Sequence, residues 1–395
     1  MAGRAGGGAG SLDASFGSGG EVALSTAFEP QALLVQPNGA ILVAASTQVG
    51  ASEIMRFQPN GQIDGSFGSR GVATLGMSVV ASLVLQTDGK IVAAGRTSSG
   101  SAQVARLATD GSADPSFGRR GVVNFAFASS GILSSAATTV LVQTDGKLVV
   151  GGLALAASSD LYYTSLARFK SNGSPDGTFG AGGFVADDLV GGITALGLQR
   201  DGKIVVCGGF ISPAQDLVVR FLSDGTLDGS VAGGGALTAA THDPLLFEGT
   251  DVFQPDLKVV QWSKVSDGSK TEAQVARVLR TFAPDPGFKS SPFAFGAPNS
   301  CCNAPNDVEV QPDGKLIVGG YAVGTSGNAE FGLARLLPGG GFDRGFGRNG
   351  RVVTQWQYNA TITVLAIQPD GNILAAGVET QDSATSLLLA RYLGN

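Results

Sequence analysis

The sequence is poor in histidine, cysteine and long apolar runs, and each shortage excludes a class of protein. His242 is the only histidine, so a site with two histidine ligands is impossible and a Ser–His–Asp triad would depend on that one residue. No stretch approaches the roughly 18 consecutive apolar residues of a membrane span, so we expect no transmembrane segment. We predict no metal site and no cofactor.

Three cysteines are too few for a disulfide framework. Cys207 lies among small apolar residues of a predicted strand and is expected to be an inert core thiol. Cys301-Cys302 lie in a predicted loop, where we expect two free thiols. The alternative is a strained, redox-labile disulfide between these neighbours.

Charge is also scarce, at 15% of residues, and the net charge of −6 disfavours a nucleic-acid groove or binding to an anionic membrane surface. The hydrophobic share of 43% is too high for a disordered chain. Glycine is abundant, with 60 residues and no collagen period, which indicates many tight turns. Residues 1–11 contain no apolar signal core and are predicted to be a flexible lead, followed by a single domain at 12–395.

A motif recurs about every 55 residues along the chain. One copy contains Gln86 before an Asp-Gly turn, then Arg106, then Asp114 eight residues later and Phe117 three residues further on. The glutamine recurs seven times, at Gln36, Gln86, Gln143, Gln199, Gln254, Gln311 and Gln368. The arginines are Arg56, Arg106, Arg168, Arg220, Arg277, Arg335 and Arg391. The aspartates are Asp64, Asp114, Asp176, Asp228, Asp285 and Asp343, and only Val231 replaces the phenylalanine.

The seventh copy is split between the two ends of the chain. Arg391 has no aspartate after it, whereas Asp13 and Phe16 open the chain with no arginine before them. A ring needs this arrangement and a linear solenoid does not, because in a ring the first strand completes the last unit. We therefore predict an all-β, seven-bladed β-propeller with four-stranded antiparallel blades, in which the strand near Gly20 to Leu24 joins the last three strands.

Each unit reads as four strands. The first ends at the glutamine, and an Asn-Gly or Asp-Gly turn leads into the second, as in a β-hairpin. Small residues in the second strand, such as Gly151-Gly152 and Gly319-Gly320, suit close packing of neighbouring blades. The third strand carries the arginine and the fourth is a Gly-x-Val segment. No segment has a sustained helical period with caps, so we expect almost no helix.

The constant spacing of eight residues predicts an ion pair within each blade, such as Arg106 with Asp114, with the phenylalanine packed between blades. Removing one partner of a buried pair costs about 3–5 kcal/mol, so replacing Asp114 by alanine should lower stability markedly.

Connection lengths separate the two faces of the ring. The first and third connections of each unit are constant, whereas the second and fourth vary: glutamine to arginine takes 20 residues in the first two units and 25 between 143 and 168. Variable loops on a rigid scaffold are where binding is usually built. We predict that any ligand lies on this variable face, near the mouth of the channel. Candidate residues, which we assign to its loops, are Tyr162, Tyr163, His242, Trp262, Tyr321 and Trp356. The alternative is that the aromatics cover apolar surface at the loop bases and that His242 is a plain surface histidine.

Carboxylates are the chemistry by which this chain would be an enzyme. Most aspartates belong to turns, but Asp187-Asp188, Asp243, Asp251 and Asp307 lie on or near the variable face, where two could act as acid and base or could be solvated charges. The dinucleotide-like run from Gly345 to Gly350 lies in a repeat connection with no helix after it and is not a cofactor site. We assign no catalytic residue.

The fifth unit departs from the pattern, with Leu257 in place of the turn glycine and Thr281-Phe282 at its second turn; we also count Val231 as part of it. Drift in one blade and specialisation for a partner both explain this.

The run Gln-x-Asp-Gly-Lys-Ile, followed by Ala-Arg-Leu-x-x-Asp-Gly-x-x-Asp-x-Ser-Phe-Gly-x-x-Gly-x-Val, resembles the delta-60 repeat, a bacterial β-propeller family, over nearly all of residues 12–393. The resemblance implies a propeller that is extracellular, on the cell surface or periplasmic, and it brings no catalytic residues. We predict a monomeric, non-enzymatic binding or scaffold propeller that recognises a protein or a glycan through the variable face. The alternatives are a propeller hydrolase or lyase with paired carboxylates near the channel, and a structural spacer excised from a longer chain.

Overall fold

The computed structural model describes residues 7–25, 28–47, 50–127, 131–157, 161–211, 214–230, 236–240, 252–266, 270–279, 283–296, 303–323, 327–382 and 384–395. In these ranges every regular element is a strand, which agrees with the expected scarcity of helix. No helix long and apolar enough to cross a membrane occurs among the described residues.

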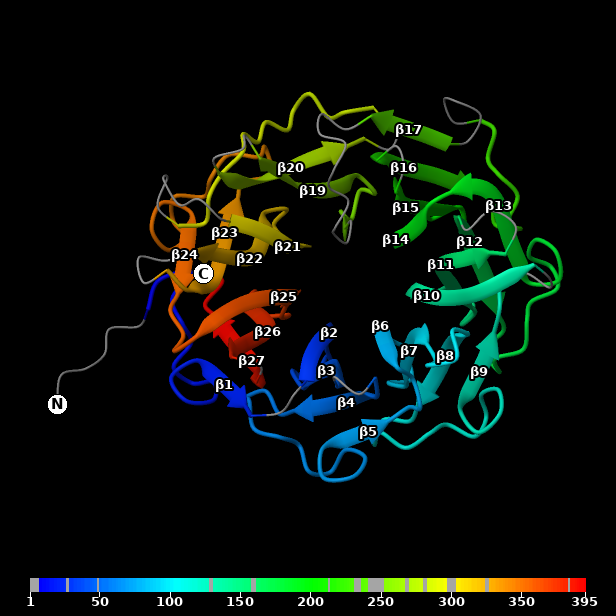
Figure 1. The fold of residues 1–395 in the computed structure, drawn as a ribbon, viewed down its shortest axis with the longest axis horizontal. Helices are drawn as coiled ribbons and strands as arrows, with labels where there is room; N and C mark the ends of the chain where they lie inside the picture. The colour runs from blue at the N-terminus through cyan, green and yellow to red at the C-terminus, as the bar shows by residue number, and fades with distance from the viewer. Residues whose placement is uncertain are drawn as a thin grey trace.

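Seven separate sheets are arranged around a central axis, and in each complete blade the first strand lies innermost (Figure 1). The seven-bladed propeller predicted from the repeat is confirmed. Blades one to three are β2 (Phe28–Val35), β3 (Ile41–Thr47), β4 (Ser52–Phe57) and β5 (Val72–Thr74); β6 (Val79–Leu85), β7 (Ile91–Arg96), β8 (Ala102–Leu107) and β9 (Val122–Phe125); and β10 (Ile132–Val142), β11 (Leu148–Ala156), β12 (Tyr162–Phe169) and β13 (Phe184–Val190).

Blades four to seven follow in the same order. They are β14 (Gly192–Leu198), β15 (Ile204–Ile211), β16 (Ala214–Phe221) and β17 (Ala236–Ala240); β18 (Val252–Phe253), β19 (Val259–Ser266) and β20 (Thr271–Val278); β21 (Asn303–Val310), β22 (Leu316–Val323), β23 (Ala329–Leu336) and β24 (Arg351–Thr354); and β25 (Asn359–Ile367), β26 (Ile373–Gln381), β27 (Ala384–Tyr392) and β1 (Glu21–Leu24).

The ring closes as the split repeat predicts. Strand β1 pairs antiparallel with β27, with Glu21 opposite Ala390 and Leu24 opposite Leu387. The closure also includes residues that we assigned to the flexible lead. Gly10 donates its N–H to the carbonyl of Leu393, and Leu393 donates its own N–H to the carbonyl of Ser11. The propeller therefore begins before Leu12, and a turn that is continuous in other blades is here assembled from both ends of the chain.

The paired glycines of the second strands have two different roles. A Cβ on Gly151 would lie 2.9 Å from the side chain of Ile193 in the next blade, as predicted for close packing between blades. A Cβ on Gly152 would instead lie 2.1 Å from the carbonyl oxygen of Ala136 in its own blade. That carbonyl adjoins a β-bulge in β10, between Ala137 and Thr139. The second glycine thus makes room for a bulge that the sequence pattern does not reveal.

The fifth blade differs from the rest, as its sequence indicates. Its turn lacks glycine, and Leu257 adopts the left-handed conformation with φ 62° while its N–H still bonds to the carbonyl of Gln254. Its sheet has three strands in the described residues, and Phe293 bridges Ala273 where a fourth strand would lie. Val231 follows β16 and so belongs to the fourth blade, not the fifth; it and Thr281-Phe282 are outside the described residues.

Candidate functional site

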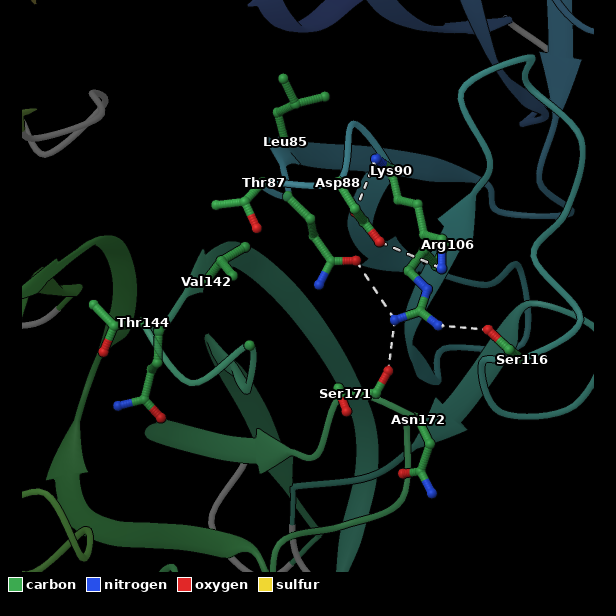
Figure 2. A pocket seen from close by; sticks show the side chains of 13 residues that line it. Leu85, Thr87, Asp88, Lys90, Arg106, Ser116, Val142, Thr144, Ser171 and Asn172 are labelled. Atoms are coloured by element: carbon green, nitrogen blue, oxygen red, sulfur yellow. Dashed lines mark hydrogen bonds and ion pairs between the residues drawn. The ribbon is translucent and has the colours of Figure 1, made fainter.

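The face that carries the constant turns is held together by ion pairs. In blade two, Arg106 Nε lies 2.8 Å from Oδ2 of Asp114, and Lys90 Nζ lies 3.1 Å from the same oxygen. The Arg106 guanidinium also bonds to the hydroxyl of Ser116 and, at 2.5 Å, to the carbonyl of Ser171 in the next blade (Figure 2). One arginine therefore joins two blades.

The predicted pair occurs in all seven blades. The pairs are Arg56–Asp64 (2.7 Å), Arg106–Asp114 (2.8 Å), Arg168–Asp176 (2.8 Å), Arg220–Asp228 (2.7 Å), Arg277–Asp285 (2.8 Å), Arg335–Asp343 (3.0 Å) and Arg391–Asp13 (2.8 Å). Their carboxyl groups lie beside strong donors. For Asp176, burial opposes ionisation, but hydrogen bonds from Thr178 and the charge of Arg168 outweigh it and lower the pKa to about 2.

The bond from the arginine to the next blade was not predicted. The acceptors are the carbonyls of Thr109, Ser171, Ser223, Pro338, Gly394 and Pro59, for Arg56, Arg106, Arg168, Arg277, Arg335 and Arg391 in that order. Each of these arginines also stacks on the phenylalanine of its own blade, with 4.6–4.8 Å from guanidinium to ring centre. The arginine, aspartate and phenylalanine of the motif thus maintain the ring.

A hollow of about 680 Å³ lies on this face between blades two and three (Figure 2). Its charged side chains are already engaged: Arg106 and Lys90 with Asp114, and Lys90 also with Asp88. The other lining groups are neutral: Leu85, Gln86, Thr87, Ser116, Val142, Gln143, Thr144, Gly146, Ser171 and Asn172. The hollow has no described charge left over to bind an ion. No group of three or more potential metal-ligating side chains was found among the described residues.

The variable face differs from the prediction in one respect, because extra residues there lengthen strands rather than loops. We assigned Tyr162 and Tyr163 to a loop, but they begin β12, and Trp262 and Tyr321 lie within β19 and β22. The assignment was wrong because a glutamine-to-arginine spacing does not distinguish a longer hairpin from a longer loop. Trp356 does lie in the connection before β25, and His242 is outside the described residues.

The candidate aromatics do not form one platform. Trp262 is 5% exposed and belongs to the core between blades five and six. Trp356 packs on the buried ring of Phe331 with 5.2 Å between ring centres, and Tyr321 lies opposite Phe331 in the sheet. Tyr162 and Tyr163 are half-buried in blade three. For Trp262 and Trp356 the structure therefore supports the packing alternative.

Sequence reasoning missed two leucines on the same face. Leu133 is 60% exposed and Leu161 is 42% exposed, the two highest values among the described large hydrophobic side chains. Backbone bonds hold them at one end of blade three, since Ala156 donates to the carbonyl of Leu161 and Ala157 donates to that of Gly131. We call residues 131–135, 153–157 and 161–163 the blade-three tip. The long spacing between Gln143 and Arg168 signalled an insertion there, but not its apolar surface.

The carboxylate alternative can be examined at Asp307. Its side chain accepts hydrogen bonds from the backbone N–H groups of Val308 at 2.9 Å and, in the next blade, Leu365 at 2.7 Å. Two residues further along β21, burial and the charge of Asp307 raise the pKa of Glu309 to about 8. Asp307 therefore has a structural task between blades. Asp243 and Asp251 are outside the described residues, and for Asp187-Asp188 only the backbone is described.

Comparison with known proteins supports a repeat-type β-propeller family. Residues 36–67, 86–117, 143–179, 199–230 and 311–346 match the family described as "Domain of unknown function (DUF5122) beta-propeller". The matched segments begin at a repeat glutamine and extend to or beyond the repeat aspartate. The delta-60 name stays a prediction. No curated protein sequence matches the chain.

Several solved structures resemble the chain at low identity. Polysaccharide lyase Uly1 is 9% identical with a TM-score of 0.46, covering 91% of this chain and 89% of its own. The BP39L lectin from Burkholderia pseudomallei is 15% identical with a TM-score of 0.45, covering 92% and 98%. A protein of unknown function from Dyadobacter fermentans DSM 18053 is 12% identical with a TM-score of 0.43, covering 95% and 98%. No functional conclusion follows from similarities at this level.

Proposed function

We propose that this chain is a non-enzymatic, exported binding scaffold that recognises a protein partner through the variable face, centred on the blade-three tip. The observation that carries the proposal is the joint exposure of Leu133 and Leu161 on that tip. Exposing large apolar side chains to water is unfavourable, by about 25 cal/mol for each Å² of apolar surface. Two large apolar side chains exposed at one end of the same blade, on a rigid scaffold, suit a protein-binding surface.

The contrast between the two faces supports this choice. The motif residues of the turn face are occupied with one another and with neighbouring blades, so those residues are committed to holding the ring. On the variable face, β10 and β11 extend to 11 and 9 residues and raise the tip above shorter neighbours such as β6 and β7, with 7 and 6 residues. An apolar tip also fits a protein partner better than a glycan, because the aromatics expected to form a sugar platform are dispersed and partly buried.

The test compares two double variants of the intact chain. L133S/L161S removes the apolar groups of the tip, whereas I63S/L227S removes two exposed apolar groups from the turn face, where Ile63 and Leu227 are 37% and 39% exposed. Proteins captured by the wild-type chain from culture medium and cell-surface extract would be purified, and their affinity for each variant measured by biolayer interferometry.

We expect affinity to fall at least tenfold for the tip variant and to stay within about twofold for the turn-face variant, since a few buried anchors dominate protein interfaces. Equal affinities for both variants would refute the assignment of the tip. Binding on a glycan array with no protein partner would refute the choice of partner. Turnover of a glycan would refute the non-enzymatic reading.

A further inference from the structure

The connection between β23 and β24 in blade six is unusually basic for an acidic protein. Arg344, Arg348 and Arg351 lie within eight residues of one another, on the outer edge of the ring and at the constant-turn face. No ion pair is formed by any of the three in the described structure, whereas all seven repeat arginines are paired with aspartate. These cations therefore take no part in the ion pairs that hold the ring.

The other blades show that the fold does not need them. At the position of Arg344, blades one and two have Gly65 and Pro115. At the position of Arg351, the same blades have Val72 and Val122. At the position of Arg348, blade one has Ser69 and blade two has Arg119. Blade one therefore makes the same connection with none of the three arginines, and blade two makes it with only the counterpart of Arg348.

Two hollows open beside these arginines and share a wall. One, of about 660 Å³, is lined by Gly10, Ser11, Phe295, Gly296, Gly347, Arg348, Asn349, Arg351, Val352 and Val353. The other, of about 630 Å³, is lined by Gly341, Phe342, Arg344, Asn349 and Arg351. Arg351 and Asn349 border both, so each hollow has two guanidinium groups, with Arg351 common to the two.

Arg351 is half-buried and held in place. Its guanidinium lies 4.2 Å from the centre of the Phe342 ring, and its buried Nε has no hydrogen-bond partner. Burial lowers the pKa of Arg351, and nearby Glu272 opposes this. A buried donor without an acceptor is costly, and an anionic group paired with the rest of this guanidinium would offset part of that cost.

The backbone around the arginines is also fixed before any ligand binds. Arg348 donates its N–H to the carbonyl of Arg351, and Gly347 donates to the carbonyl of Ala9 from the other end of the chain, both at 2.8 Å. Between Arg348 and Arg351, Asn349 adopts the left-handed conformation with φ 56°. Binding to such a site would require little further ordering of the connection, which favours affinity.

We infer that the two hollows beside Arg344, Arg348 and Arg351, which we call the blade-six arginine site, bind an acidic peptide segment of a partner protein. Carboxylates of the segment pair with guanidinium groups in both hollows, where planar forks match carboxylate geometry. Apolar side chains between the carboxylates contact Val352 and Val353 on the wall of the first hollow. This apolar wall favours a peptide over a sulfated or carboxylated glycan, whose backbone is polar.

The test measures fluorescence anisotropy of a labelled peptide, Glu-Val-Glu-Gly-Glu-Val-Glu, with the full chain at low ionic strength. The variant R348S/R351V replaces each arginine with the residue that blade one carries at the same position, Ser69 and Val72. The control variant R119S/R120N removes two positive charges from the matching connection of blade two, so both variants have the same net charge.

We expect R348S/R351V to weaken binding at least tenfold, the scale of one lost hydrogen bond to a charged group, and R119S/R120N to change it by less than threefold. A peptide with glutamine in place of each glutamate should bind at least tenfold more weakly than the acidic one. Equal effects of the two double variants, or equal binding of the two peptides, would overturn the site. Binding of a sulfated oligosaccharide without binding of the acidic peptide would overturn the ligand class. Leu133 and Leu161 are unchanged in these variants, so the result is independent of the function proposed for the blade-three tip.

Discussion

Arg391 Nη2 lies 2.8 Å from Oδ2 of Asp13, and this contact joins residues 378 positions apart in the sequence. It has the geometry of the six pairs that other blades form across eight residues. The same arginine donates to the hydroxyl of Ser15 and to the carbonyl of Pro59 in blade one. The ends of the chain are therefore held by the contacts that hold every other blade, with no separate closing device.

The closing pair is expected to be as important for stability as an internal one, but to act on a different strand. Asp13→Ala and Asp64→Ala are well matched, because neither aspartate has a lysine partner like Lys90 of blade two. At the position of Lys90, the blade of Asp13 carries Asn372 and the blade of Asp64 carries Ala40. Both substitutions should lower the free energy of unfolding by about 3 kcal/mol, measured by denaturant titration.

Hydrogen exchange distinguishes the two variants. Asp13→Ala should expose the amides of β1 to faster exchange, because β1 follows Asp13 and has only β27 as a partner. Asp64→Ala should leave β1 protected. Unchanged exchange of β1 in Asp13→Ala would mean that the strand pairing alone closes the ring.

The turn assembled from both ends can be tested at a glycine. Gly10 has φ 87°, and a Cβ there would lie 2.8 Å from the backbone N of Gly347. Gly19 has φ 71° with no atom within 4 Å of such a Cβ. Both alanine variants incur backbone strain, but only Gly10→Ala adds a clash. Gly10→Ala should therefore lose about 1–2 kcal/mol more stability than Gly19→Ala and unfold at a lower temperature. Equal melting temperatures would show that residues 9–11 contribute little to closure.

Within one blade, the two aspartates of the same connection should differ sharply. Asp114 is 5% exposed, forms ion pairs with Arg106 and Lys90, and accepts a hydrogen bond from the hydroxyl of Ser116. Asp110 is an exposed turn residue that accepts a hydrogen bond from the hydroxyl of Ser112. Asp114→Ala should cost about 3–5 kcal/mol of stability, and Asp110→Ala much less, because Asp110 is exposed to solvent and its carboxylate bonds only within its own turn. Thermal unfolding measures both. Similar costs would show that the pair with Arg106 is not the main contribution of Asp114.

Acid stability should depend on the buried aspartates. The pKa of Asp176 is lowered to about 2 in the folded protein, below its ordinary value of 3.8. The folded state therefore binds fewer protons than the unfolded state in this window, and the stabilisation is present above pH 3.8 and lost as the pH falls towards 2. Asp176→Asn should be less stable than wild type at pH 6 and approach it near pH 2. A constant difference over this range would contradict the assignment.

Glu309 should have the opposite dependence. Its pKa is raised to about 8, so between its ordinary value of 4.5 and 8 the folded state binds more protons than the unfolded state, and stability falls as the pH rises. Glu309 lies two residues before its repeat glutamine, where blades one and three carry Leu34 and Leu141. Glu309→Leu should therefore stabilise the protein at pH 8 by about 2 kcal/mol and have a smaller effect at pH 4. Equal effects at both pH values would indicate that Glu309 does not titrate in this range.

The sequence by itself determined the number of blades, the closure by β1, the Arg–Asp pairs and the identity of the constant-turn face. These features follow from spacing. In each internal copy a short turn separates the arginine from the aspartate by eight residues, so the guanidinium and the carboxylate meet in the same way each time. The split copy at Asp13 and Arg391 could be counted without any coordinates.

Only the tertiary structure decided what each blade contacts in the next one. The acceptor of Arg106 in blade three is the carbonyl of Ser171, and a backbone carbonyl has no residue-specific signal in a sequence. Longer spacing could not show whether Tyr162 lies in a loop or a strand, and the apolar content of a segment could not show that Trp262 is buried while Leu133 is exposed. Burial depends on contacts between neighbouring blades. These contacts join residues that are far apart in the chain, and they form only when the ring has closed.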